Sequence, residues 1–221
     1  MERMDEGMPF LLRYENVAWY ENGRVRILDR RVYPAQVRFV ECASYREVAQ
    51  AVRDMVTQSA GPYTAVGMGM ALAAHECRDR SGEEQAAFLE QASRELASAR
   101  PTAANRYAAV TESCRRAALE ALRTGCDPAE AAVRTTVESL NRRYGKMQAV
   151  GDRLAELIPD GGTILTQCFG ETIIGTVMRA ARRQNKTFRV FCAETRPYLQ
   201  GARLTASCFA EMGFDTTVVT D

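Results

Sequence analysis

The sequence predicts an α/β protein in which a small antiparallel sheet with helices precedes a truncated βαβαβ unit with a parallel sheet. Two patterns predict this class. Near the N-terminus, apolar and polar residues alternate on both sides of Asn22-Gly23, the sequence of a type I′ hairpin turn. From Thr163 onward, short β-branched segments alternate with helical ones, as in parallel sheets with right-handed crossovers. We place two domains at residues 1–155 and 156–221.

The N-terminal domain is expected to begin with three strands. A hairpin pairs residues 17–20 with 24–28, and residues 37–41 form a third strand. Start and stop signals then mark a series of helices. These signals are the capping boxes Ser44/Glu47 and Ser81/Glu84, the breaks at Gly61-Pro62 and Pro101, the stop at Gly125, and the start at Asp127-Pro128 of a helical region that ends at Pro159.

The C-terminal domain is expected to be a partial Rossmann-like sheet. Ligands of open parallel sheets bind outside the carboxyl ends of the strands, so the residues that follow each strand are the first candidates for a site. The expected strands are 163–168, 188–194 and 216–221, and the expected helices are 170–184 and about 200–212.

Composition excludes several function classes. The net charge of +1 over 221 residues gives no reason to expect nucleic acid or an anionic membrane as partner. No apolar run approaches the roughly 18 residues of a spanning helix, and the N-terminus lacks a signal-peptide pattern, so we expect a cytoplasmic protein. Seven cysteines without a Cys-x-x-Cys pair, and the single His75, argue against disulfides, a metal site and triad chemistry. His75 is expected to be packed or on the surface.

Cys168 lies where the first C-terminal strand gives way to a helix. The N–H groups and the positive dipole end of that helix favour a thiolate or a bound phosphate. Position alone supports two interpretations equally: Cys168 is a reactive cysteine open to solvent, or it is a strand-end cysteine that faces the core. The other six are expected to fill packing space. They are Cys42, Cys77, Cys114, Cys126, Cys192 and Cys208.

Two further stretches carry candidate binding residues. The segment 194–206, ETRPYLQGARLTA, follows the second strand and therefore lies at the same edge of the sheet as Cys168. It is either a solvated loop or, because Pro197 and Gly201 constrain it, a segment whose Gln200 contacts a phosphate. Arg100 lies between two helices and is either a binding residue or part of an ordinary turn.

Five stretches together resemble one family. They are VECASYREVAQAVRDMV, RPTAAN, ILTQC, ETRPYLQGARLTA and VVTD, in this order. The chain is similar to the methylthioribose-1-phosphate isomerase family, which is related to the alpha, beta and delta subunits of translation initiation factor 2B and to ribose-1,5-bisphosphate isomerases. The resemblance implies a Rossmann-like C-terminal domain, a homodimer, and conversion of a ribose 1-phosphate to a ribulose 1-phosphate in methionine salvage. It implies no cofactor.

The resemblance also assigns site residues. The family's catalytic cysteine falls on Cys168, and its substrate-binding arginine and glutamine fall on Arg100 and Gln200. Its phosphate loop, Arg-Gly-Ala-Pro, falls on residues 58–61, so Gln58, Ser59 and Ala60 are the expected phosphate contacts. Since a neutral amide has replaced the arginine at Gln58, we expect a divergent substrate, such as another 5-modified ribose 1-phosphate.

Other departures bear on the chemistry. The histidine and asparagine that flank the family's cysteine are replaced by Gln167 and Phe169. The family's catalytic aspartate, in a Gly-Ala-Asp-Arg motif, falls beyond the matched residues. Because a proton-transfer isomerase needs an acid–base partner for its thiol, that partner is expected from another subunit, from a complementing C-terminal chain, or from Glu194 or Asp221.

Three functions therefore stay open at this point. The first is an aldose–ketose isomerase of 5-methylthioribose 1-phosphate or a similar sugar phosphate. The second is a non-catalytic regulatory or assembly subunit, as in the initiation-factor branch. The third is a sugar-phosphate sensor that binds without turnover.

Overall fold

The computed structural model describes residues 3–221, which divide into two compact units. The antiparallel unit comprises Tyr14–Val32 and Val37–Leu140. The parallel unit comprises the residues up to Arg13, Tyr33–Gln36 and Asn141–Asp221. These units are defined by contacts and do not test the expected domain boundary at residue 155, which stays a prediction.

The antiparallel unit begins with a three-stranded sheet. After the short helix α1 (Tyr14–Val17) come β1 (Ala18–Glu21), β2 (Arg24–Leu28) and β3 (Phe39–Cys42), in the order β1-β2-β3. Asn22 and Gly23 have φ values of 50° and 74°, so the predicted type I′ turn is confirmed. That turn sets the register in which Ala18 pairs with Ile27.

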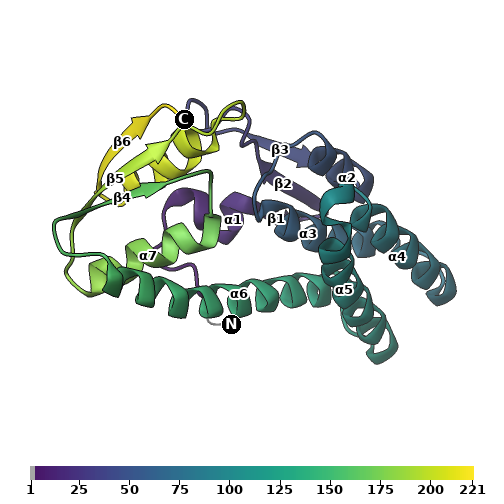
Figure 1. Ribbon diagram of the computed structural model, residues 1–221. Coiled ribbons are helices and arrows are strands. Elements are labelled where there is room, and N and C mark those ends of the chain that lie inside the picture. Colours follow the sequence, from purple (N-terminus) through teal and green to yellow (C-terminus); the bar gives the residue numbers. More distant parts are fainter. Residues whose placement is uncertain (1–2) are drawn as a thin grey trace. The chain divides into compact units, whose positions relative to one another are not determined.

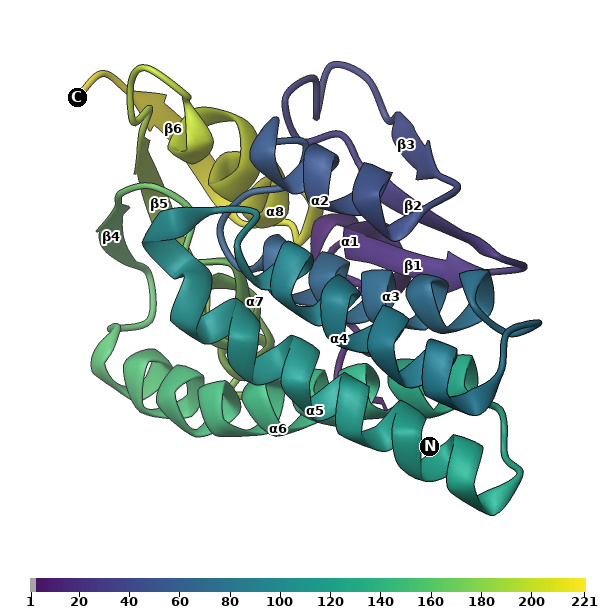
Figure 2. The same cartoon turned by 90° about the vertical axis from the view of Figure 1, so that its right-hand side faces the viewer.

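The helices of this unit gather around α3. Because α3 consists largely of small residues, it is buried along nearly its whole length and packs against β1, α2, α4 and α5, as Figures 1 and 2 show. A Cβ added at Gly67 would lie 2.5 Å from Oγ1 of Thr136, so this glycine permits close packing. The helices are α2 (Tyr45–Arg53), α3 (Gly61–Glu76), α4 (Gly82–Ala97), η2 (Pro101–Ala103), α5 (Ala104–Thr124) and α6 (Pro128–Leu157), whose residues from Asn141 belong to the parallel unit.

The parallel unit contains the predicted βαβαβ arrangement, so the α/β fold class is confirmed. Its three strands are parallel in the order β4-β5-β6 (Figure 1). Ile164, Val190 and Thr216 are cross-strand neighbours. Val190 and Cys192 are fully buried, and rings of Phe188, Phe209 and Phe214 form an aromatic cluster. The elements are η1 (Phe10–Leu12), β4 (Gly162–Thr166), α7 (Glu171–Arg183), β5 (Phe188–Ala193), η3 (Gly201–Thr205), α8 (Ala206–Glu211) and β6 (Asp215–Val219).

The expected helix ends are largely confirmed, with two differences. Ser81 and Glu84 form a complete capping box, and Gly125 ends α5 in the left-handed conformation. At α2, Ser44 accepts from the amide of Glu47, but the Glu47 carboxylate accepts from Ala43 rather than from Ser44. The helix expected at about 200–212 is divided into a π-helical turn, η3, and the short α8. No helix within residues 3–221 combines the length and apolar character needed to cross a membrane.

Candidate active site

Cys168 lies at the carboxyl edge of the parallel sheet, between the end of β4 at Thr166 and the start of α7 at Glu171. The residue is exposed, so the interpretation that it faces the core is wrong. Gly170, the N-cap of α7, provides no side-chain cap for the first amides of that helix. The thiol therefore lies at a sheet edge and a helix start, where parallel sheets bind ligands.

The backbone of Cys168 is held by two threonine side chains. Its N–H donates to Oγ1 of Thr195 at 2.8 Å, and its carbonyl accepts from Oγ1 of Thr205 at 2.5 Å. Cys168 has φ 59°, in the left-handed region that a residue with a Cβ rarely adopts. Tertiary contacts, rather than regular secondary structure, thus fix its conformation.

Asp221 supports the same edge. Its Oδ1 accepts from the N–H of Thr195 at 2.7 Å, and its Oδ2 accepts from the N–H of Arg196 at 2.6 Å. The N–H groups of Arg196 and Thr195 lower the pKa of the Asp221 carboxyl. With both oxygens engaged and ionisation favoured, Asp221 is suited to holding the loop and poorly suited to carrying a proton. Glu194, the other candidate, forms an ion pair with Arg196 at 3.1 Å.

Gln200 is half-buried and precedes the π-helical turn η3. Gly201 begins this turn directly over the end of β5, where no side chain fits. Arg203, in the same turn, donates to the carbonyl of Tyr198 and thereby folds the preceding loop back on itself. π-helical turns occur often at functional sites, which agrees with a binding role for this segment.

The loop of residues 58–60 lies in the antiparallel unit. Gln58 is buried, and its carbonyl accepts from Nη1 of Arg30 at 2.7 Å. Ser59 is exposed with φ 58°, and Ala60 is the N-cap of α3 without a side-chain cap. The side chain that replaces the family's phosphate-binding arginine is thus mostly shielded from solvent, while Ser59 is open to it.

Arg100 belongs to the same unit as this loop. Its guanidinium interacts with the phenol of Tyr107, where it opposes the increase in pKa that burial causes. The Tyr107 ring packs edge-on against Tyr63 at 5.4 Å, and Tyr63 is in the first turn of α3, directly after the loop. The structure therefore links Arg100 to residues 58–60 through this tyrosine pair.

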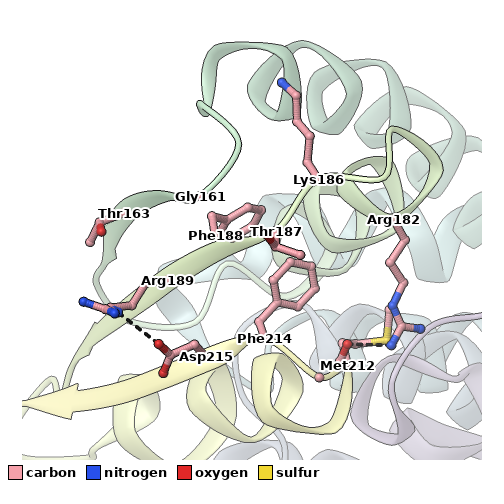
Figure 3. Close-up of a pocket in the computed structure, with 11 residues that line it drawn as sticks. Gly161, Thr163, Arg182, Lys186, Thr187, Phe188, Arg189, Met212, Phe214 and Asp215 are labelled. Atoms are coloured by element: carbon pink, nitrogen blue, oxygen red, sulfur yellow. Dashed lines mark hydrogen bonds and ion pairs between the residues drawn. The ribbon is translucent and has the colours of Figure 1, made fainter.

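A cavity of about 630 Å³ lies at the opposite edge of the parallel sheet, where the strands begin (Figure 3). Its cations already have partners. Arg189 pairs with Asp215 at 2.9 Å and Arg182 donates to the carbonyl of Met212, while Lys186 donates to carbonyls at the end of α6. Because these charges are engaged within the protein, this cavity is a poorer candidate for a phosphate site than the carboxyl edge.

The remaining cysteines differ in accessibility. Burial raises the pKa of Cys42 to about 12 and of Cys114 to about 11, and it also raises the pKa values of Cys77 and Cys192. Cys208 is buried as well, so these five fill packing space as predicted. The prediction is wrong for Cys126, which is exposed because it follows the helix stop at Gly125. His75 is half-buried, and its ring packs on Gly23, as expected for a structural histidine.

Sequence reasoning missed Thr195 and Thr205. Both lie within the segment 194–206 that carries the resemblance. A hydrogen bond between a hydroxyl and the backbone of a residue far away in the sequence leaves no recognisable pattern in the neighbouring residues. Membership of this segment was the only signal, and it singled out Gln200 rather than the threonines.

Comparisons with known proteins show to which family the chain belongs. The model of the Initiation factor 2 subunit family matches residues 60–221. Methylthioribose-1-phosphate isomerases of Pelotomaculum thermopropionicum, Thermotoga neapolitana and Desulforudis audaxviator are 33%, 35% and 37% identical over 94%, 95% and 92% of this chain. The chain spans 59%, 62% and 60% of these relatives' lengths.

Two solved structures share the fold. Translation initiation factor eIF-2B subunit delta from A. fulgidus has a TM-score of 0.74 and 29% identity, with 93% of this chain and 62% of that chain covered. The 5-methylthioribose 1-phosphate isomerase from Pyrococcus horikoshii has a TM-score of 0.73 and 26% identity, with 100% of this chain and 64% of that chain covered. The resemblance inferred from sequence motifs is confirmed, and the chain belongs to the Initiation factor 2 subunit family.

Proposed function

We propose that this protein acts as an aldose–ketose isomerase on 5-methylthioribose 1-phosphate or a similar 5-modified ribose 1-phosphate. The observation that carries the proposal is the exposed Cys168, held in a left-handed conformation at the carboxyl edge of the parallel sheet. Relatives that are named methylthioribose-1-phosphate isomerases, with up to 37% identity, support the choice of reaction.

The chemistry is an internal transfer of hydrogen. The ribose ring must open, after which hydrogen leaves C2 and arrives at C1, so that an aldose becomes a ketose with no external oxidant or reductant. A thiol at Cys168 exchanges a proton with the sugar as general acid or base. The preceding geometry makes Asp221 a loop support, so we assign the acid–base partner to a second chain.

Five further residues are proposed to bind the substrate. Arg100 contributes a guanidinium suited to phosphate, Gln200 contributes an amide, and the loop of Gln58, Ser59 and Ala60 contributes the uncapped start of α3.

The proposed context follows from the relatives. We propose a cytoplasmic protein that forms a homodimer or joins a complementing chain equivalent to the part of the relatives that this chain does not match. Sedimentation of the purified protein tests the homodimer. Addition of the segment of the Thermotoga neapolitana relative that this chain does not match tests the complementing chain.

The reaction is tested by NMR with substrate in D₂O. Production of the ribulose 1-phosphate, with exchange or transfer of the C2 hydrogen, supports the proposal. Cys168→Ser is expected to reduce turnover by at least 100-fold, since general acid–base groups contribute about 10²–10⁴-fold. Cys126→Ser is the matched control, because Cys126 is the other exposed cysteine within residues 3–221. Unchanged turnover in Cys168→Ser refutes the assigned mechanism.

The binding residues are tested by their effect on KM. Arg100→Gln and Gln200→Ala are expected to raise KM at least tenfold, since each removes a contact with the sugar phosphate. Arg123→Gln is the control, because Arg123 is exposed and pairs with Glu120 on its own helix. Equal KM values in all three variants contradict the assignment of the binding site.

A second candidate function is supported by the similarity to the A. fulgidus initiation-factor subunit. A regulatory or assembly subunit would bind partner chains and show no turnover with or without them. Chromatography with candidate partners, combined with the NMR assay, separates the two functions. Calorimetric binding of the sugar phosphate without product would instead indicate a sensor.

A further inference from the structure

We infer that Thr195 and Thr205 are positioning residues that aim the Cys168 thiol, with Asp221 fixing the loop of Thr195. The inference rests on the proposed function, because it gives these residues a purpose through the catalytic cysteine. Neither threonine touches the reacting atoms in this assignment. Each acts on the backbone of Cys168, and the backbone determines the direction in which the thiol projects.

The conformation of Cys168 requires such support. Non-glycine residues persist in the left-handed region when their surroundings over-determine them, and such residues gather at active sites. Three of them occur at this edge of the sheet, with φ values of 59° at Cys168, 63° at Thr195 and 57° at Leu199. At this edge of the sheet, the residue with the proposed catalytic thiol is therefore held in a backbone conformation that non-glycine residues rarely adopt.

The hydroxyl of Thr195 bridges β5 and Cys168. It donates its proton to the carbonyl of Ala193 at 3.2 Å, which leaves an oxygen lone pair directed to the N–H of Cys168 at 2.8 Å. The arrangement needs one group that both donates and accepts, as a hydroxyl does. Serine would preserve it, whereas valine would keep the shape and β-branching of threonine without the hydrogen bonds.

Thr205 secures the other side of the same residue. Its side chain is fully buried in the π-helical turn η3, and its hydroxyl donates to the Cys168 carbonyl at 2.5 Å. Both backbone polar groups of Cys168 are therefore bound by threonine hydroxyls.

Asp221, two residues after the end of β6 at Val219, completes the arrangement. One carboxylate oxygen accepts from the amide of Thr195 and the other from the amide of Arg196, so two successive N–H groups are pinned by one side chain. The carbonyl of Thr195 also accepts from the amide of Leu199 at 2.7 Å. Thr195 is thus anchored through its amide, carbonyl and hydroxyl, and it transmits that rigidity to Cys168.

The test compares Thr195→Val with Thr195→Ser, and uses Thr217→Val on β6 as the control because Thr217 is exposed. Thr195→Val is expected to lower kcat at least tenfold with KM within twofold, and Thr195→Ser to restore kcat to within threefold of wild type. Thr205→Val is expected to lower kcat in the same way, and it replaces Thr195→Val as the test if that variant does not fold. A folded Thr195→Val variant with wild-type kcat overturns the inference.

A second readout does not depend on turnover. Amide hydrogen exchange at Cys168 is expected to accelerate at least tenfold in Thr195→Val and to return to the wild-type rate in Thr195→Ser. If the wild-type protein shows no isomerase activity, the proposed function fails, and accelerated exchange still supports control of the Cys168 backbone by Thr195. Unchanged exchange in Thr195→Val overturns that control whatever the activity.

Discussion

Gly201 lies directly on the carbonyl oxygen of Ala193: a Cβ built on this glycine would come within 1.8 Å of that oxygen. The contact joins the end of β5 to the start of the π-helical turn. Because Gln200 is the preceding residue, the position of its side chain depends on this close approach. The glycine therefore couples the end of the sheet to a proposed binding residue.

Gly201→Ala is expected to destabilise the protein by about 2 kcal/mol, within the range for overpacking a well-packed position. The added methyl group must displace either the end of β5 or the π-helical turn, so isomerase KM should rise as well. Urea unfolding measures the stability change. Gly145→Ala is the control, because a Cβ there meets only Met4 Cε at 4.0 Å, and it should be neutral or stabilising by up to about 1 kcal/mol. Equal effects of the two substitutions would contradict the packing argument.

The elements that sequence could predict are those whose signals are local. The Asn22-Gly23 turn, the capping box at Ser81 and the stop at Gly125 each depend on a few neighbouring residues, and each is present. The same holds for Cys168, whose place at a strand–helix junction can be recognised from the chain around it.

What sequence could not predict depends on contacts between distant residues. Thr195 meets Cys168 across a separation of 27 residues, through the parallel pairing of β4 with β5. The π-helical turn arises where Gly201 packs on Ala193, which helical periodicity does not encode. Because cysteines are usually buried, the sequence favours a packing role for Cys126, yet the chain leaves helix α5 just before this residue and exposes it.

Asp29 is expected to make stability depend on pH below about 4. Hydrogen bonds from the Arg31 side chain, together with Arg38, lower the pKa of the Asp29 carboxyl from 3.8 to about 2, although burial opposes them. A lowered pKa in the folded state stabilises the protein above the unfolded-state pKa, and this contribution is lost as pH falls from about 4 to about 2. The loss should be about 2 kcal/mol.

Thermal unfolding between pH 5 and pH 2, at about half-unit intervals, measures this slope. Asp29→Asn should flatten the part of the curve between about pH 4 and pH 2, since the titrating group is removed. Asp79→Asn should leave this part of the curve unchanged, because the Asp79 side chain is 85% exposed and its ion pair with Arg78 is long, at 3.6 Å. The same slope in Asp29→Asn and wild type would show that other carboxyl groups carry the acid sensitivity.

Alkylation of the folded protein should modify two of its seven cysteines. Cys126 and Cys168 are exposed, whereas the other five are buried. Brief treatment with iodoacetamide at neutral pH, followed by mass spectrometry, should locate the label at these two positions, and all seven should react in denaturant. Label at Cys42 or Cys192 in the folded protein would contradict the burial that the structure assigns to them.

Gly23 and Gly125 provide a test of what positive φ costs in this fold. Both adopt the left-handed conformation, with φ values of 74° and 72°. A Cβ at Gly125 meets nothing within 4 Å, whereas one at Gly23 would lie 2.6 Å from Nε2 of His75. Gly125→Ala should therefore cost about 1–2 kcal/mol from conformation alone, and Gly23→Ala should cost more.

A double-mutant cycle with His75→Ala identifies the cause of the additional cost of Gly23→Ala over Gly125→Ala. If the clash with the imidazole supplies it, Gly23→Ala in the His75→Ala background should cost only as much as Gly125→Ala, and the coupling energy should be about 1 kcal/mol or more. Urea unfolding of the four proteins measures the coupling. Additive effects of the two substitutions would mean that the His75 ring moves aside freely, and that it does not fix the hairpin against α3.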